Sequence, residues 1–211
     1  MDTTYRNLGY FFMLLIPLTF FAFYRTYINQ FPNFNEKVTM MIHLHAVIAG
    51  LWIFIIISQP LFIRQKNLKA HRMVGKASYI IFPLLIVSFL PQIIRIIESG
   101  NYKFLFFPVG DGVLLIAFYS LAIYYKRKVY KHMRYIIAGA LVFLGPTVGR
   151  IGPIWLGLSD LLTQNIQYTL IFSVLGLLIW YDKKNGRKFQ PFLVAIPLFA
   201  LHAITYYLLF T

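Results

Sequence analysis

Cysteine is absent from this sequence, and acidic residues are few, with six Asp and Glu against twenty Lys and Arg. Without cysteine the chain has no disulfide bond and no thiolate that could act as a nucleophile or metal ligand. Charged residues make up only 12% of the chain, about half the share of an ordinary soluble domain. Such a sequence cannot cover a water-soluble fold with charge.

Apolar residues take the place of the missing charge. They form 59% of the 211 residues, and the mean hydropathy is +0.69. Lipid must therefore be the solvent for much of the surface, and we expect one transmembrane domain over residues 1–211. In a soluble protein the net charge of +14 would suggest a nucleic-acid partner. Here the positive residues fall between apolar runs, which is typical of membrane topology, so no nucleic-acid partner is expected.

Seven apolar runs can cross a bilayer, which needs about 20 residues per helix. Because backbone groups in lipid must be satisfied within the segment, each run is predicted to be a helix and the fold to be all-α. The first run has no small-residue cleavage site after it, so we expect a retained helix. The predicted spans are residues 8–27, 38–61, 77–97, 104–125, 134–157, 166–181 and 191–210.

The distribution of positive charge predicts the orientation. Fifteen Lys and Arg fall at Arg6 and in the segments 64–76, 126–134 and 182–188, whereas five fall on the other side. Loops rich in Lys and Arg stay in the cytoplasm. We therefore expect a cytoplasmic N-terminus, an external C-terminus, and contact of the basic side with anionic head groups of the bilayer.

Six ionisable residues fall inside the predicted spans, where charge is costly and usually faces the bundle interior or a cavity. With the predicted orientation all six lie in the outer half of the bilayer. This convergence predicts a polar pocket near the outer leaflet. The six residues are His43, His45, Arg95, Asp111, Arg150 and His202.

Helical spacing separates the two neighbouring histidines. His43 and His45 are about 200° apart around a helix, so they cannot both face the pocket. His45 shares a face with Gln59, whereas His43 lies on a stripe of small residues that suits helix contact. A polar row on the next span aligns at spacings of four and three and consists of Ser88, Gln92 and Arg95. Tyr206, one turn beyond His202, adds a hydroxyl to the face of that histidine.

Two interpretations of the pocket involve a bound cofactor. Histidines on two helices can ligate haem b axially, as in membrane redox proteins, and arginines can pair with its propionates. The haem ligands would be His45 and His202, with Arg95 or Arg150 at a propionate. Alternatively, two or three histidines and a carboxylate can hold zinc and leave one position open for water, as in a membrane hydrolase acting on lipid. The zinc set would be His43, His45, His202 and Asp111.

Other interpretations need no metal. The pocket could hold a small molecule or a lipid, either for binding or as the site of a transporter. It could also be structural, with Asp111 paired with Arg150 because either charge alone in a bilayer would be costly. The sequence leaves these alternatives open.

Two basic segments, expected to be cytoplasmic loops, have a similar composition. They read KAHRMVGKASY over 69–79 and YKHMRY over 130–135, and each sets a histidine near an arginine. Such clusters attract anionic head groups. They either determine topology or bind an anionic substrate, partner or head group through His71, Arg72, His132 and Arg134.

The second span and the segment after it read HLHAVIAGLWIFIIISQPLFIRQKNLKAHRMVGKASY. This stretch resembles a bacterial family of small multi-span membrane proteins filed as domain of unknown function 2306. Members resemble it in a membrane histidine, a glycine and a glutamine near the helix end, followed by His-Arg-x-x-Gly. The matching residues here are His45, Gly50, Gln59, His71, Arg72 and Gly75.

A second stretch, HMRYIIAGALVFLGPTVGR, resembles the later helix of that family, which carries His-x-x-Arg and ends in another arginine. The matching residues are His132, Arg134 and Arg150. One residue fewer separates the histidine from the first arginine, and Met133 stands where the family usually has a tryptophan. The resemblance covers about residues 40–155. It implies a bacterial cytoplasmic (inner) membrane location and no specific activity.

Overall fold

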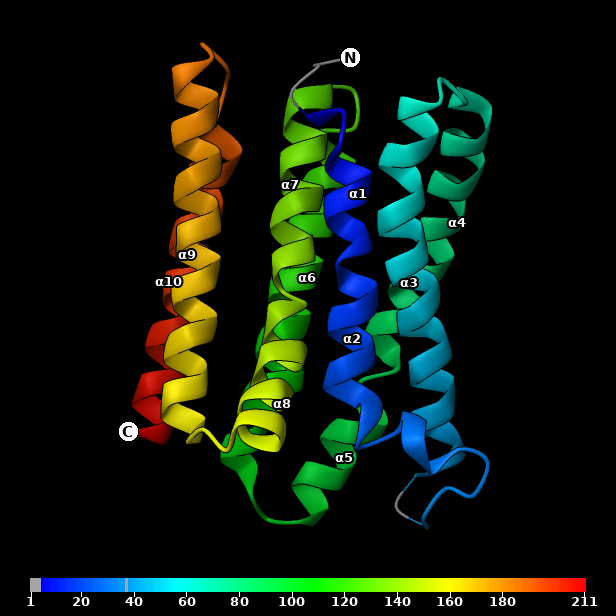
Figure 1. Ribbon diagram of the computed structural model, residues 1–211, viewed down its shortest axis with the longest axis vertical. Helices are drawn as coiled ribbons and strands as arrows, with labels where there is room; N and C mark the ends of the chain where they lie inside the picture. Colours follow the sequence, from blue (N-terminus) through cyan, green and yellow to red (C-terminus); the bar gives the residue numbers. More distant parts are fainter. Residues whose placement is uncertain (1–4, 37) are drawn as a thin grey trace. The chain divides into compact units, whose positions relative to one another are not determined.

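The computed structural model describes residues 5–36 and 38–211, and every regular element within them is a helix (Figure 1). The α-helices are α1 (Leu8–Met13), α2 (Leu15–Tyr24), α3 (Met40–Arg64), α4 (Leu68–Val87), α5 (Leu90–Glu98), α6 (Phe106–Tyr124), α7 (Val129–Leu141), α8 (Leu144–Leu156), α9 (Asp160–Lys184) and α10 (Gln190–Phe210). Short 3₁₀ turns are formed by Ile28–Gln30 and Tyr102–Leu105.

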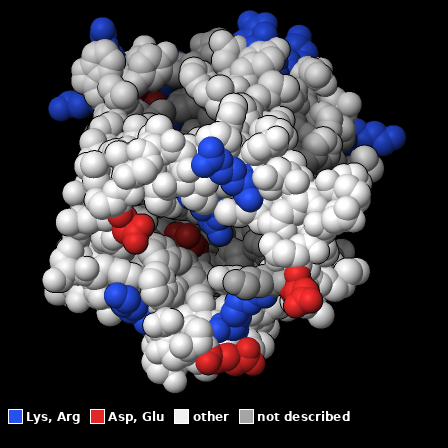
Figure 2. Space-filling view, turned by 60° about the horizontal axis from the view of Figure 1, so that its bottom comes forward, with Lys and Arg blue, Asp and Glu red and all other residues white. Residues whose placement is uncertain are grey.

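Six helical segments in the described part of the chain are long and apolar enough to cross a membrane. They are Met40–Arg64, Leu68–Glu98, Tyr102–Tyr124, Val129–Leu156, Asp160–Lys184 and Gln190–Phe210. The N-terminal apolar segment, Leu8–Tyr24, is shorter. Figure 2, in which the bottom of the Figure 1 view comes forward, shows scattered charged side chains on a mostly uncharged surface. The prediction of an all-helical integral membrane bundle is confirmed.

Three of the apolar segments are interrupted, and a proline lies just after each interruption. Pro17 is the third residue of α2, Pro91 the second of α5 and Pro146 the third of α8. Proline has no N–H and cannot bond the carbonyl of the preceding turn, so the helix ladder is broken there. The first, third and fifth predicted spans therefore each consist of two consecutive helices.

Several helices extend beyond the limits that hydropathy predicts. Helix α4 begins at Leu68 rather than at residue 77, and the Asn67 side chain accepts a hydrogen bond from the Ala70 N–H. Helix α9 begins at Asp160 rather than at residue 166. Long basic side chains can reach water from such turns, so the end of an apolar run does not mark the end of a helix. The two basic segments expected as loops are therefore largely helical.

Contacts within the chain gather in two compact units, one ending at Arg95 and the other formed by Ile96–Thr211. In the first unit α3 packs against α1 and α4. In the second unit α6 packs against α7, α8 against α9, and α10 against α6, α7 and α9. The single domain expected over the chain thus contains two packing units. The fully buried side chains of the second unit include Phe118, Ala122, Ala138, Leu175, Phe192 and Ala195.

Candidate functional site

A row of polar side chains connects three helices of the second unit. Asp111 lies in the second turn of α6, and its Oδ1 atom is 3.5 Å from Nε2 of His202 on α10. The other ring nitrogen of His202, Nδ1, is 3.0 Å from the hydroxyl oxygen of Tyr168 on α9. His202 and Tyr168 are buried and Asp111 is partly buried. The row therefore runs from α6 through α10 to α9.

Helix α8 presents glycines to this region. Gly145, Gly149 and Gly152 recur at spacings of four and three and so share one face of the helix. A Cβ atom on Gly145 would lie 3.1 Å from Oδ2 of Asp111, and one on Gly149 would lie 3.7 Å from Nε2 of Gln164. A Cβ on Gly152 would overlap a side chain of α9. Without side chains on this face, the α8 backbone approaches the polar groups of α6 and α9 closely.

Three buried polar atoms near this face have no hydrogen-bond partner among the described residues. They are Thr163 Oγ1, Gln164 Oε1 and Gln167 Oε1. The two glutamine side chains both lie within 4.0 Å of the position that a Gly149 Cβ would take. An unpaired buried polar atom costs about 1–3 kcal/mol, so nearly all such atoms have a partner in proteins. A group of them indicates a place for water or a small polar molecule.

Arg150 supplies the positive charge of this region. It follows Gly149 on α8 and donates a hydrogen bond to the Pro146 carbonyl at 2.8 Å. It also attracts the Asp111 carboxylate electrostatically. Asp111 makes its 3.5 Å contact with His202, and the ion pair of Asp111 with Arg150 stays a prediction. A group of each charge sign therefore occurs in this region.

The remaining residues of the predicted pocket belong to the first unit. Nδ1 of His45 is 2.8 Å from Oγ of Ser88, so this histidine faces the C-terminal end of α4. Nδ1 of His43 is 2.7 Å from the hydroxyl oxygen of Tyr27. Arg95 is exposed at the end of this unit. The two histidines thus point to different partners, as their helical spacing requires.

Haem ligation by His45 and His202 stays a prediction, because the two residues belong to different units. The surroundings of His202 disfavour it. Its Nδ1 is bonded to Tyr168, and its Nε2 lies near Asp111 and would be 2.8 Å from a Cβ on Gly110. An iron atom would have to displace one of these neighbours.

The predicted zinc set is also divided between the two units: His43 and His45 belong to the first, and Asp111 and His202 belong to the second. Asp111 and His202 are in contact, whereas His43 and His45 are bonded to side chains of the first unit. Among residues 5–36 and 38–211, no three Cys, His, Asp or Glu side chains lie together as metal ligands would. Three protein ligands are the usual minimum for catalytic zinc, so the described geometry does not support this site.

The basic segment at the start of α7 forms an internal ion pair. Nε and Nη2 of Arg134 donate to the two carboxylate oxygens of Asp182 on α9, at 2.7 and 2.8 Å. Nη1 of Arg134 donates to the Tyr130 carbonyl at 3.0 Å. Arg134 is 1% exposed and Asp182 is fully buried. The guanidinium of Arg134 is thus satisfied inside the protein, which favours a structural role over the anion contact that the sequence left open.

The other residues of the predicted anion site lie near helix starts. Nδ1 of His132 is 2.8 Å from the Ala122 carbonyl oxygen, which joins α7 to the end of α6. His71 is partly buried and Arg72 is exposed, both in the first turns of α4. A head-group contact at Arg72 stays a prediction.

The polar face of α9 carries no acidic or basic side chain within the membrane span and was not among the predicted site residues. Its members are Thr163, Gln164, Gln167 and Tyr168, all buried. Their spacing of one, three and one residues places them on one side of a helix, which was the available signal. The expected start of this span at residue 166 separated the first two from the others.

Comparison of the chain with protein-family models, curated proteins and solved structures found no match. The resemblance to the family filed as domain of unknown function 2306 stays a prediction. The function is therefore argued from the side chains of the site.

Proposed function

We propose that this integral membrane protein binds a small, uncharged, hydrogen-bond-donating molecule in the second unit, between the glycine face of α8 and the polar face of α9. The observation that carries the proposal is the pair of buried, unpaired amide oxygens on Gln164 and Gln167. Both glutamines are close to Gly149, where no side chain intervenes. Water is the simplest molecule that such a site would hold, and a small amide or alcohol has the same chemistry.

The unpaired atoms favour a donor as the ligand. An amide Oε1 atom can only accept a hydrogen bond, and the Thr163 hydroxyl oxygen can accept one as well. A molecule with N–H or O–H groups satisfies these atoms, whereas a molecule with acceptors alone leaves them unpaired. The lost hydrogen bonds then oppose binding.

The charge of the region favours a neutral ligand. Asp111 and Arg150 have opposite charges and attract each other. A bound ion would leave one uncompensated charge within the membrane span, which is expensive. The contacts of His202 with Tyr168 and Asp111 likewise support a metal-free site over haem b or zinc.

Saturation-transfer NMR on the detergent-solubilised protein tests this proposal with two matched probes. Formamide carries N–H donors, and N,N-dimethylformamide carries none, while each has a formyl proton as reporter. We expect formamide to receive the larger transfer. Gln167→Leu should reduce it about fivefold, as the loss of one hydrogen bond predicts.

Gln92→Leu is the matched control, because Gln92 is an exposed glutamine on α5 in the first unit. This variant should leave the formamide signal unchanged. Equal transfer to both probes would contradict the proposal, because the donors would then not matter. An unchanged formamide signal in a folded Gln167→Leu protein would contradict it as well.

A further inference from the structure

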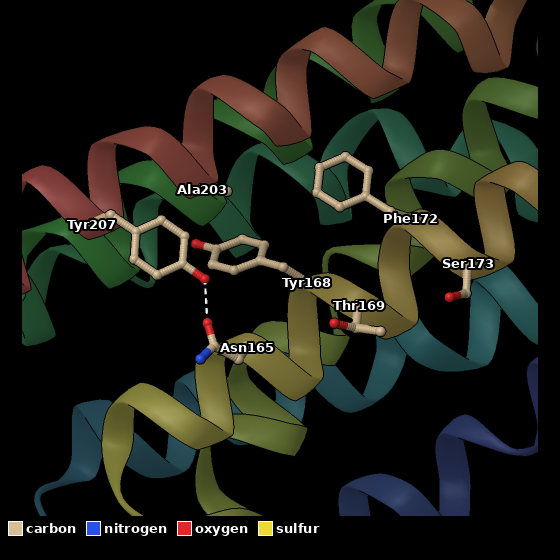
Figure 3. Close-up of a pocket in the computed structure, with 7 residues that line it drawn as sticks. All are labelled: Asn165, Tyr168, Thr169, Phe172, Ser173, Ala203 and Tyr207. Carbon is tan, nitrogen blue, oxygen red and sulfur yellow. Dashed lines mark hydrogen bonds between the residues drawn. The ribbon is translucent and has the colours of Figure 1, made fainter.

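A groove of about 640 Å³ runs between α9 and α10 (Figure 3). Its lining residues are Asn165, Tyr168, Thr169, Phe172, Ser173, Ala203 and Tyr207. The Tyr207 hydroxyl donates a hydrogen bond to Oδ1 of Asn165, which joins the two helices at one end of the groove. Both helices are long and apolar enough to cross the membrane. The groove therefore lies along two helices of the second unit that can cross the bilayer.

A polar row forms the α9 side of the groove. Asn165, Thr169 and Ser173 recur every four residues, so they share one face, and all three are exposed. On α9 this row lies on the face opposite the buried glutamines Gln164 and Gln167. It begins near the start of α9 and extends over two helical turns into the span. Exposed polar groups at this depth are unfavourable in lipid unless a partner satisfies them.

The hydroxyl groups of this row differ from hydroxyls elsewhere in the spans that bond to a carbonyl of their own helix. Thr147 and Thr205 donate hydrogen bonds to carbonyls four residues before them, at 2.6 and 2.9 Å. Such local bonding is the usual way to satisfy a hydroxyl in a membrane helix. The hydroxyls of Thr169 and Ser173 make no hydrogen bond to any described residue. They remain free for a ligand in the groove.

We propose that this groove binds an uncharged amphiphile from the bilayer, with a hydroxyl- or carbonyl-bearing head on the polar row. None of the lining side chains carries a charge, so a phosphate head would be left uncompensated. Phe172, Ala203 and the ring of Tyr207 provide apolar contact for the first carbons of the tail. The groove volume lies within the range of about 300–1,000 Å³ typical of small-molecule sites.

Tyr168 relates this groove to the internal site. Its side chain lines the groove, and its hydroxyl reaches the His202 ring at 3.0 Å. A head group bound here would contact a residue that belongs to the row from Asp111 to Tyr168. The groove proposal nevertheless stands on its own lining residues and does not require the internal ligand.

Photolabelling in phosphatidylcholine nanodiscs tests the groove. The probes are a diacylglycerol and a phosphatidic acid, each with a diazirine near its head, and labelled peptides are identified by mass spectrometry. We expect diacylglycerol to label the segment 165–173 more strongly than phosphatidic acid. Thr169→Val combined with Ser173→Ala should reduce this labelling about fivefold, since hydrogen bonds to the head are lost.

Thr205→Val is the matched control, because its hydroxyl is bonded to the Leu201 carbonyl and it does not line the groove. It should leave labelling unchanged. The Thr169 and Ser173 substitutions are small and should preserve the melting temperature; if the double variant unfolds, Ser173→Ala alone is measured. Equal labelling by phosphatidic acid, or unchanged labelling in the folded variant, would overturn the proposal.

A second copy of the chain is the competing occupant, because rows of small polar residues also pack helices together in membranes. The absence of native cysteine makes a direct check available. Under oxidation Ser173→Cys should stay monomeric; efficient disulfide-linked dimers would overturn the lipid proposal in favour of a copy. The two proposals can be tested independently. Gln167→Leu should retain the lipid labelling, and Thr169→Val combined with Ser173→Ala should retain the formamide signal.

Discussion

The guanidinium of Arg134 and the carboxylate of Asp182 form a bidentate salt bridge, with N–O distances of 2.7 and 2.8 Å. Both side chains are at most 1% exposed, and the pair joins α7 to α9. Such geometry matches the planar fork of arginine. The pair is therefore a structural contact of the second unit.

Breaking this pair should strongly destabilise the protein. Asp182→Asn leaves a buried guanidinium without its counter-charge, and we expect a loss of about 3–5 kcal/mol. Arg134→Lys should also destabilise, because an ammonium cannot form the two parallel bonds. Thermal unfolding in detergent measures both. The matched control is Asp160→Asn, an exposed acid at the other end of α9, which should change stability by less than about 1 kcal/mol.

The apolar double variant Arg134→Met with Asp182→Leu tests whether the two charges depend on each other for stability. Replacing both partners removes the charges together, so its stability should lie above that of either single variant. The single variants Arg134→Met and Asp182→Leu complete the cycle, and a double variant as unstable as the sum of these two losses would contradict a role as a coupled pair.

The glycines of α8 should differ in their tolerance of a methyl group. A Cβ on Gly152 would overlap the Thr163 side chain, whereas one on Gly149 would lie at 3.7 Å from its nearest neighbour. We expect Gly152→Ala to cost about 1–3 kcal/mol through overpacking. Gly149→Ala should be nearly neutral for folding. The two melting temperatures check this, and equal effects would count against the close approach of α8 to α9.

Much of the fold was predictable because apolar runs in lipid have few alternatives to helix. The ends of the helices were not, since Asn67 and Ser159 cap α4 and α9 outside the apolar runs. The interruption near Pro146 was visible only as a cluster of glycine and proline. Whether a membrane proline bends or interrupts its helix depends on packing around it.

The site was predictable in part. Asp111, Arg150 and His202 were expected in the outer half of the bilayer, and the structure brings Asp111 and His202 into contact, with Arg150 acting on Asp111 electrostatically. The pairing of Arg134 with Asp182 was missed because the partners lie 48 residues apart, a contact that no local pattern encodes. Gln164 and Gln167 were missed because a neutral side chain gives no topology or charge signal in a sequence.

The orientation stays a prediction, and the cysteine-free chain allows it to be tested. Single variants Gln65→Cys and Asn185→Cys lie at ends that positive charge assigns to the cytoplasm. Asn101→Cys and Thr211→Cys lie at the opposite ends. In intact cells a membrane-impermeant maleimide should label only the second pair. Residues 65 and 101 are expected on opposite sides of the membrane. Labelling of both Gln65→Cys and Asn101→Cys would therefore show that the predicted topology is wrong.

The last prediction concerns Asp111 and Arg150, whose charges attract each other within the membrane spans. Asp111→Asn leaves the arginine without compensation, and Arg150→Gln does the same to the aspartate, so each should destabilise by several kcal/mol, on the order of a broken buried pair. The double variant carries neither charge, and its loss should be smaller than the sum of the two by at least about 1 kcal/mol.

Thermal unfolding of the four proteins in one detergent gives this cycle. Arg127→Gln combined with Asp111→Asn is the control, because Arg127 is exposed and lies beyond the end of α6 that is far from Asp111, so those two losses should add. Additive losses for Asp111 and Arg150 would show that the charges do not compensate each other. The argument for a neutral ligand would then fail, because the site would hold a net charge that a bound ion could balance.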